Sequence, residues 1–289
     1  MSHAQGSYYL PAPSHWPVVG SVGITLLLGG FASFLHGGDE MFMIAGAVVI
    51  AIMMFGWFGQ VISESQAGKY DAQVDTSFRM GMVWFIFSEV MFFAAFFGAL
   101  FYVRQFAVPW IDGAGNNAAT GELLWPSFTA DWPLLNNPDA EKYVKPDSVI
   151  GAWGIPFYNT LILLTSGVTV TFAHWALKKG NKGGTTMWLF ATVALGAVFV
   201  VLQAYEYGHA YQDLNLKLSS GIYGSTFFML TGFHGLHVTI GAIMLFVMMI
   251  RSAKGHFSPK NHFAFEAAAW YWHFVDVVWL GLFIFVYWL

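Results

Sequence analysis

The 289-residue chain has no cysteine and few charged residues. Without cysteine it can form no disulfide, thiolate metal site, iron–sulfur cluster or cysteine nucleophile. Charged residues make up only 10% of the chain, whereas soluble domains contain about 25%. The net charge of −4 gives no basic surface for nucleic acid, so we expect no nucleic-acid partner.

Apolar residues make up 57% of the chain and aromatic residues 19%, and the mean hydropathy is +0.57. These values predict an integral membrane protein. The first Lys or Arg is Lys69, so the N-terminal segment lacks the positive charge of a signal peptide and the arginines of a transit peptide. We therefore expect the first apolar run to insert as a helix and to be retained.

Seven nearly charge-free runs are long enough to cross a bilayer core, which needs about 20 helical residues. They are apolar on nearly all faces, as in membrane helices, and lack the alternation of a β-barrel. The sequence therefore predicts an all-α polytopic protein with one membrane domain, 1–289, and a long outer loop at 105–148. The seven runs are 17–36, 41–62, 80–103, 151–177, 185–206, 222–250 and 265–288.

The distribution of Lys and Arg predicts the orientation, because cytoplasmic loops are enriched in these residues. Eight lie on the side of the N-terminus: Lys69, Arg79, Lys178, Lys179, Lys182, Arg251, Lys254 and Lys260. Four lie on the opposite side: Arg104, Lys142, Lys145 and Lys217. We therefore expect a cytoplasmic N-terminus and a C-terminus outside.

Glu89 is the notable acid within the third run, about ten residues and roughly 15 Å from its inner end. A charge near the middle of a bilayer costs at least about 2.5–3.5 kcal/mol. Glu89 should therefore be protonated, paired or turned toward protein. It is either a proton-responsive group or a neutral acid that joins two helices.

Further polar residues occur in the later runs. Asp276 lies three residues after His273, which suggests a mutual hydrogen bond or a proton relay. Glu206 and His209 share a helix face near the outer end of the fifth run, which suggests an interfacial polar cluster. Their neighbours Tyr205, Tyr207 and Tyr211 would form an aromatic belt.

His234 and His237 are also three residues apart, in the sixth run. Such a pair could hold a metal if His174 or His273 completed the site. Interhelical hydrogen bonds are the more ordinary use of membrane histidines. We therefore predict no metal site and no catalytic residue in this chain.

Four segments resemble subunit III of the haem–copper cytochrome c oxidases. They are EAAAWYWHFVDVVWL (266–280), YGSTFFMLTGFHGLHVTIG (223–241), FSEVMFF (87–93) and NTLILLTSGVTVTFAH (159–174). The N-terminal third resembles that family mainly in its number of helices and in Ser63-Glu64-Ser65. Together the four segments cover most of the third to seventh runs.

The resemblance implies seven helices in two bundles, 1–62 and 63–289, with a V-shaped cleft that holds phospholipids. It implies a complex that passes electrons from cytochrome c to oxygen and pumps protons. Haem and copper would lie in subunits I and II, with none in this chain. This subunit would support proton uptake and the stability of subunit I. A small subunit IV and a bacterial inner membrane are also implied, and a mitochondrial membrane is the alternative.

By the same resemblance, Glu89 matches the buried carboxylate of the family. Trp57, Glu64, Arg79 and Arg251 match positions of the lipid cleft. Many relatives have Trp-Trp-Arg-Asp where this chain has Trp57-Phe58-Gly59-Gln60, so a charged lipid contact is missing here.

Two other functions compete with this interpretation. A related subunit of a quinol oxidase or nitric oxide reductase would lack the first two helices, which this chain has. A stand-alone proton-coupled transporter could use Glu89 and Asp276, and the purified chain alone would then transport its substrate.

The orientation can be tested directly because the chain contains no cysteine. A cysteine introduced at Asn181 should react with an impermeant maleimide only in inverted membrane vesicles. A cysteine introduced at Asn116, in the outer loop, should react in intact cells. Labelling of the Asn181 position in intact cells would refute the predicted topology.

Overall fold

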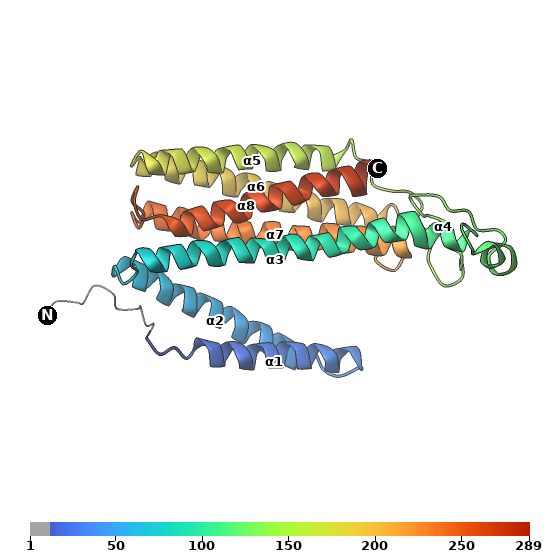
Figure 1. The fold of residues 1–289 in the computed structure, drawn as a ribbon, viewed down its shortest axis with the longest axis horizontal. Coiled ribbons are helices and arrows are strands. Elements are labelled where there is room, and N and C mark those ends of the chain that lie inside the picture. The colour runs from blue at the N-terminus through green and yellow to red at the C-terminus, as the bar shows by residue number, and fades with distance from the viewer. Residues whose placement is uncertain (1–11) are drawn as a thin grey trace. The chain divides into compact units, whose positions relative to one another are not determined.

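A computed structural model describes residues 12–289, and this range is helical, with no strand (Figure 1). Seven helical segments within it are long and apolar enough to cross a membrane, which confirms the predicted fold class. The long helices are α1 Trp16–Leu35, α2 Met41–Gln66, α3 Ala72–Tyr102, α5 Ile155–Lys178, α6 Lys182–Gln212, α7 Ile222–Ala253 and α8 Phe263–Leu282. The short ones are η1 Val103–Ala107, α4 Val108–Ile111, η2 Thr120–Leu124 and η3 Phe283–Trp288.

The third span continues further than the sequence predicted. Residues of η1 and α4 extend it to Ile111, into the range predicted as loop. Arg104, taken as the end of the span, donates to the carbonyl oxygen of Leu289 at 2.9 Å. Because its charge is engaged by a backbone carbonyl, the helix can continue past it.

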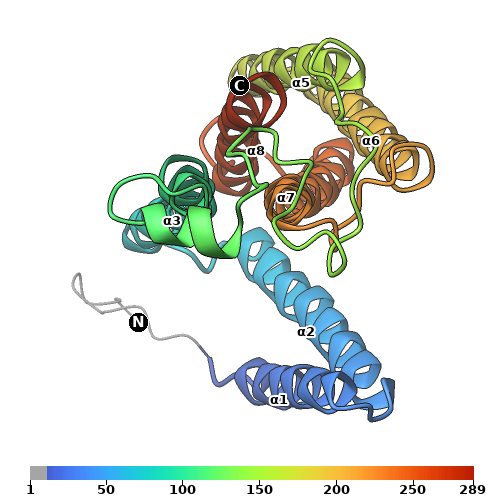
Figure 2. The ribbon, with the colours of Figure 1, turned by 90° about the vertical axis from the view of Figure 1, so that its right-hand side faces the viewer.

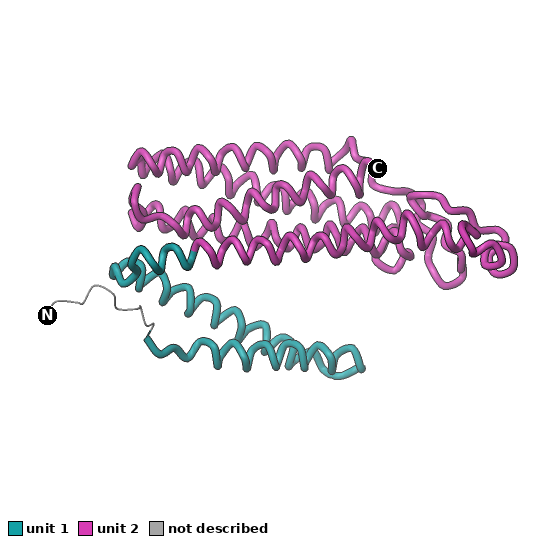
Figure 3. The backbone as a smooth tube through the Cα atoms, in the orientation of Figure 1, with its two compact units in different colours: residues 1–78 teal, residues 79–289 magenta. Residues whose placement is uncertain are grey.

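Cα distances divide the chain into two compact units, residues 1–78 and 79–289 (Figure 3). The division falls after Phe78, whereas the resemblance implied one after Ile62. The segment between belongs with the first unit because Tyr70 donates to Glu64 at 2.8 Å and its ring meets Phe78 edge-to-face. The V-shaped cleft concerns the relative placement of the two units and stays a prediction.

In the first unit, α1 and α2 pack closely at glycines. A Cβ atom at Gly30 would lie 2.3 Å from the Met43 nitrogen, and one at Gly46 would lie 2.2 Å from the Leu27 nitrogen. Small residues at such crossings let the backbones of two membrane helices approach closely. This close packing stabilises their association, because the hydrophobic effect does not drive helices together in lipid.

In the second unit, α5, α6, α7 and α8 form a ring in which each helix contacts the next (Figure 2). α3 lies outside this ring, beside α7 and α8 (Figure 2). Its contacts to them include aromatic pairs: Phe92 meets Phe233 of α7 at 5.1 Å, and Phe93 meets Phe274 of α8 at 6.1 Å between ring centroids.

The core of the ring is built around Trp272 of α8, which is fully buried. Its indole N–H donates to the Ser166 hydroxyl of α5 at 2.8 Å. Its ring lies against Gly196 of α6 and Gly241 of α7, where a Cβ atom would come within 2.7 and 2.8 Å of it. One side chain therefore contacts the three other helices of the ring.

Trp279 repeats this arrangement two helical turns further along α8. Its indole N–H donates to Thr160 of α5 at 2.9 Å. Its ring meets Phe199 of α6 at 4.7 Å and His234 of α7 at 5.1 Å. The seven-residue spacing puts both indoles on the same face of α8, where each satisfies its donor inside the protein.

Replacing Trp272 should therefore loosen the bundle. Trp272→Ala should destabilise it by about 3–5 kcal/mol, and Trp272→Phe should cost less because most of the ring volume remains. The temperature at which the chain dissociates or aggregates in purified complex should fall in that order. Trp175→Phe changes a tryptophan that is 56% exposed and should leave the temperature unchanged; an unchanged temperature for Trp272→Ala would contradict the assigned role.

Candidate functional site

Glu89 lies opposite His237. Its Oε2 atom is 2.8 Å from the Nε2 atom of His237, so an acid of α3 is hydrogen-bonded to a histidine of α7. The side chains are 21% and 11% exposed, respectively. Phe92 and Phe93 pack against the imidazole at 5.7 and 4.9 Å between ring centroids. The imidazole of the pair is therefore packed among aromatic rings.

The contact of the other ring nitrogen of His237, Nδ1, shows how many protons this pair carries. Nδ1 lies 2.6 Å from the Phe233 carbonyl oxygen, which can only accept, so Nδ1 carries a hydrogen. The short contact between Nε2 and the carboxyl group then requires a second proton. That proton resides either on Glu89, giving two neutral groups, or on His237, giving an ion pair. In both states the pair has no net charge, which suits its depth in the membrane.

His234 does not share a site with His237. Its Nε2 atom is 3.2 Å from the Val275 carbonyl oxygen of α8, and its ring packs on Phe199 and Trp279. The two histidines therefore join α7 to different neighbours, and the spacing that suggested a shared metal serves two interhelical contacts instead.

Asp276 and His273 lie together on α8, with 3.5 Å between Oδ2 and Nδ1. Asp276 is buried and its Oδ1 atom has no hydrogen-bond partner. His273 is half exposed and lies 3.5 Å from the Thr171 hydroxyl. A Cβ atom at Gly167 would lie 2.4 Å from Oδ2 of Asp276. The carboxyl group therefore packs directly against the backbone of α5, and a larger residue at this position would displace it.

Glu206 and His209 have different hydrogen-bond partners. Glu206 is buried, and its Oε1 atom accepts from the Tyr287 hydroxyl at 2.7 Å. His209 instead contacts Asp213 at 2.7 Å on an exposed surface. The partner of the acid comes from η3, which the spacing along one helix did not indicate.

The residues compared with the lipid cleft have protein contacts of their own. Arg79 forms an ion pair with Glu266, and Arg251 is buried with its guanidinium over the Phe257 ring at 4.7 Å. In the first unit, Glu64 accepts from Gln60 at 3.0 Å and from Tyr70 at 2.8 Å.

Gln60 extends this series of hydrogen bonds. Its side-chain oxygen accepts from the indole N–H of Trp16 at 2.9 Å. Trp57, also compared with the lipid cleft, is 44% exposed. These contacts leave the lipid roles of Trp57 and Glu64 as predictions.

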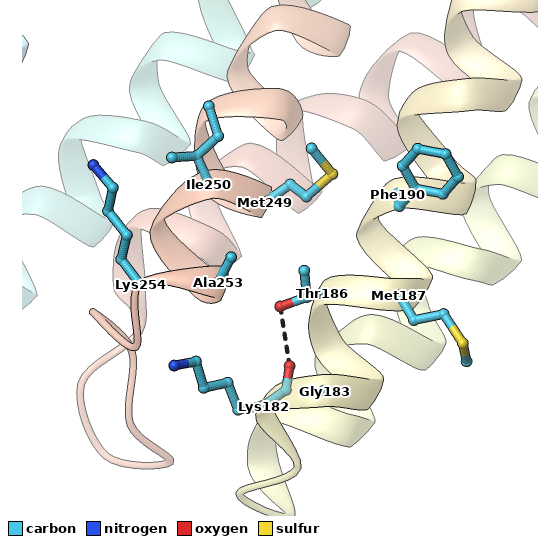
Figure 4. Close-up of a pocket in the computed structure, with 9 residues that line it drawn as sticks. All are labelled: Lys182, Gly183, Thr186, Met187, Phe190, Met249, Ile250, Ala253 and Lys254. Carbon is cyan, nitrogen blue, oxygen red and sulfur yellow. Dashed lines mark hydrogen bonds between the residues drawn. The ribbon is translucent and has the colours of Figure 1, made fainter.

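A groove of 780 Å³ lies between the start of α6 and the end of α7 (Figure 4). Lys182 and Lys254 are among its lining residues, and the ammonium group of Lys254 is directed away from α6. Its walls are apolar and include Phe190, Met249 and Ile250. Basic residues along an apolar groove are the combination that suits an anionic headgroup with its acyl chains.

Comparison with known proteins identifies the class. The family model of cytochrome c oxidase subunit III matches residues 6–115 and 146–289. Cytochrome c oxidase subunit 3 of Equus caballus is 39% identical over all 289 residues and 99% of its own length. The same subunit of Raphicerus melanotis is 40% identical, and that of Felis catus 39%, with the same coverage.

The fold and these matches define an integral membrane subunit of a respiratory oxidoreductase complex. The chain belongs to the cytochrome c oxidase subunit III family. It is a non-catalytic subunit and its partners are the other oxidase subunits. Residues 116–145, within the predicted outer loop, fall outside the family model.

Proposed function

We propose that this chain supports proton uptake, binds phospholipid and stabilises catalytic subunit I in a proton-pumping cytochrome c oxidase. The observation that carries the proposal is the Glu89–His237 pair. It holds one exchangeable proton between two helices, and it needs no redox centre to do so. Haem and copper would be held by subunits I and II, cytochrome c would be the electron donor, and a small subunit IV would be a further partner.

We propose the inner membrane of a bacterium as the location, with the N-terminus cytoplasmic and the C-terminus periplasmic. The eight-to-four bias of Lys and Arg between the two sides supports this orientation. The unmatched stretch 116–145 would then lie in the periplasm. A mitochondrial inner membrane is the alternative location.

Phospholipid would bind at two places. Trp57, Glu64, Arg79 and Arg251 are proposed contacts because they match the family's lipid positions. The groove of Lys182 and Lys254 is a second candidate, and the charge and shape of its lining support it. Arginine and lysine both bind phosphate, arginine in bidentate fashion and lysine as a point charge.

Substitution of Glu89 tests the proton role. Glu89→Gln retains the volume and can still donate to Nε2 of His237, whereas Glu89→Ala leaves that nitrogen without its partner. Both complexes should show normal haem absorption and should reduce oxygen. Proton uptake should fall, or inactivation during turnover should accelerate several-fold, more in Glu89→Ala than in Glu89→Gln.

Glu206→Gln is the matched control, because it alters another acid within a span that has a different partner, Tyr287. It should leave proton uptake unchanged in assembled complex. An equal effect of the two Gln variants would argue against a special role of Glu89. Loss of haem absorption in fully assembled Glu89→Gln complex would show that the chain contributes to a redox centre.

The lipid role is tested by Lys182→Ala combined with Lys254→Ala. The purified double variant should retain about one anionic phospholipid fewer per complex, measured by mass spectrometry of extracted lipid. Lys142→Ala with Lys145→Ala removes the same charge from the outer loop and should retain the full complement. Equal lipid content in all three complexes would refute a headgroup site in the groove.

A further inference from the structure

Three potential metal ligands converge near one end of the second unit, the five-helix unit of α3 and α5 to α8. They are His174, His262 and Glu266. His174 lies in the last turns of α5, His262 directly precedes α8, and Glu266 lies in its first turn. One donor atom from each lies within 4.8 Å of the other two. Within residues 12–289, this is the single group of three or more His, Asp or Glu residues that meets that distance.

The two distances from Glu266 to the histidines match edges of a metal coordination tetrahedron. Oε1 of Glu266 is 3.2 Å from Nε2 of His262 and 3.4 Å from Nε2 of His174. Tetrahedral Zn²⁺ with ligands at about 2.0–2.1 Å separates adjacent donor atoms by about 3.3–3.4 Å. Two histidines and one carboxylate also form a known ligand set for catalytic zinc, with one position left open.

The hydrogen bonding of His262 leaves its Nε2 atom available as a ligand. The Ser258 carbonyl oxygen lies 3.1 Å from Nδ1 and can only accept, so Nδ1 carries the hydrogen. A metal-bound histidine usually donates its other N–H in this way. His262 is 8% exposed, and its Nε2 atom has no hydrogen-bond partner although it points at the carboxylate.

Two further features concern the other ligands. The Nε2 atom of His174 is also buried and without a hydrogen-bond partner. Arg79 holds the second oxygen of Glu266, which fixes the carboxylate with Oε1 toward both imidazoles, as outer-shell partners do for metal ligands. A lone pair facing a carboxylate oxygen is repulsive unless a cation lies between them, and a metal ion or a proton can fill that role.

We propose that His174, His262 and Glu266 bind one Zn²⁺ ion, which fastens the end of α5 to the start of α8. Water or a group from a neighbouring subunit would complete the coordination. The positive charges of Arg79 and of Lys178, one turn after His174, oppose the cation. The site should therefore bind zinc more weakly than a structural four-ligand site does.

The test uses the purified oxidase complex, stripped with chelator and equilibrated with increasing free Zn²⁺. Bound zinc is counted by inductively coupled plasma mass spectrometry. Wild-type complex should bind one zinc more than His174→Gln, a variant that leaves the Arg79–Glu266 pair intact. If the variant still binds that zinc, its affinity should be at least about 100-fold lower, because loss of an outer-shell partner alone costs 10–100-fold. His262→Gln should behave in the same way, and both variants should retain the chain and normal haem absorption.

His209→Gln is the matched control, since His209 contacts the carboxylate of Asp213 at 2.7 Å and belongs to no three-residue group. It should bind zinc as the wild type does. Zinc-edge absorption spectra of wild type minus His174→Gln should show nitrogen and oxygen ligands at about 2.0–2.1 Å. Identical zinc binding by wild type, His174→Gln and His262→Gln would overturn the proposal and leave a protonated His262 as the partner of Glu266.

Discussion

The hydrogen-bonded indoles of Trp272 and Trp279 are the contacts on which the five-helix unit depends. In lipid, helices gain little by burying apolar surface against one another, so close packing and internal hydrogen bonds must hold them together. Each indole provides both, because its N–H reaches α5 while its ring fills the space against α6 and α7. The glycines facing Trp272 are the necessary complement, since any larger residue would displace the ring.

This packing also positions the polar groups. His234 lies against Trp279 and reaches the backbone of α8, which fixes the rotation of α7 about its axis. His237, almost one turn later, is thereby aimed toward α3, where it meets Glu89. The Glu89–His237 pair thus depends on Trp279 of a third helix, although that tryptophan contacts His234 and not Glu89.

The sequence was sufficient for the parts of this fold that depend on local composition. Charge-free runs located all seven spans, because the cost of a charge in lipid is a property of each segment alone. The ends were less predictable: Arg104 looked like a boundary, but a carbonyl far along the chain satisfies it. Spacing identified Glu89, His237 and Asp276 as notable residues, but it could not identify partners on other helices.

The same limit explains what was missed at the candidate sites. Helical spacing pairs Glu206 with its neighbour His209, whereas its partner in the structure is Tyr287, 81 residues away in sequence. His174 was considered as a ligand beside His234, whereas the structure brings it to His262 and Glu266. His262 and Glu266 are four residues apart, a spacing that puts two side chains on one helix face. That spacing was the one signal in the sequence that could have drawn attention to them.

The attachment of α3 differs in kind from that of the other four helices. Aromatic rings along its length are adaptable contacts that tolerate sliding and rotation, so they alone would not fix its register. Three charged or polar side chains do so: Arg79 to Glu266 near the beginning, Glu89 to His237 in the middle, and Arg104 to the Leu289 carbonyl near the end. Each anchor is directional and lies at a different depth, so α3 can be held in one position without close backbone packing.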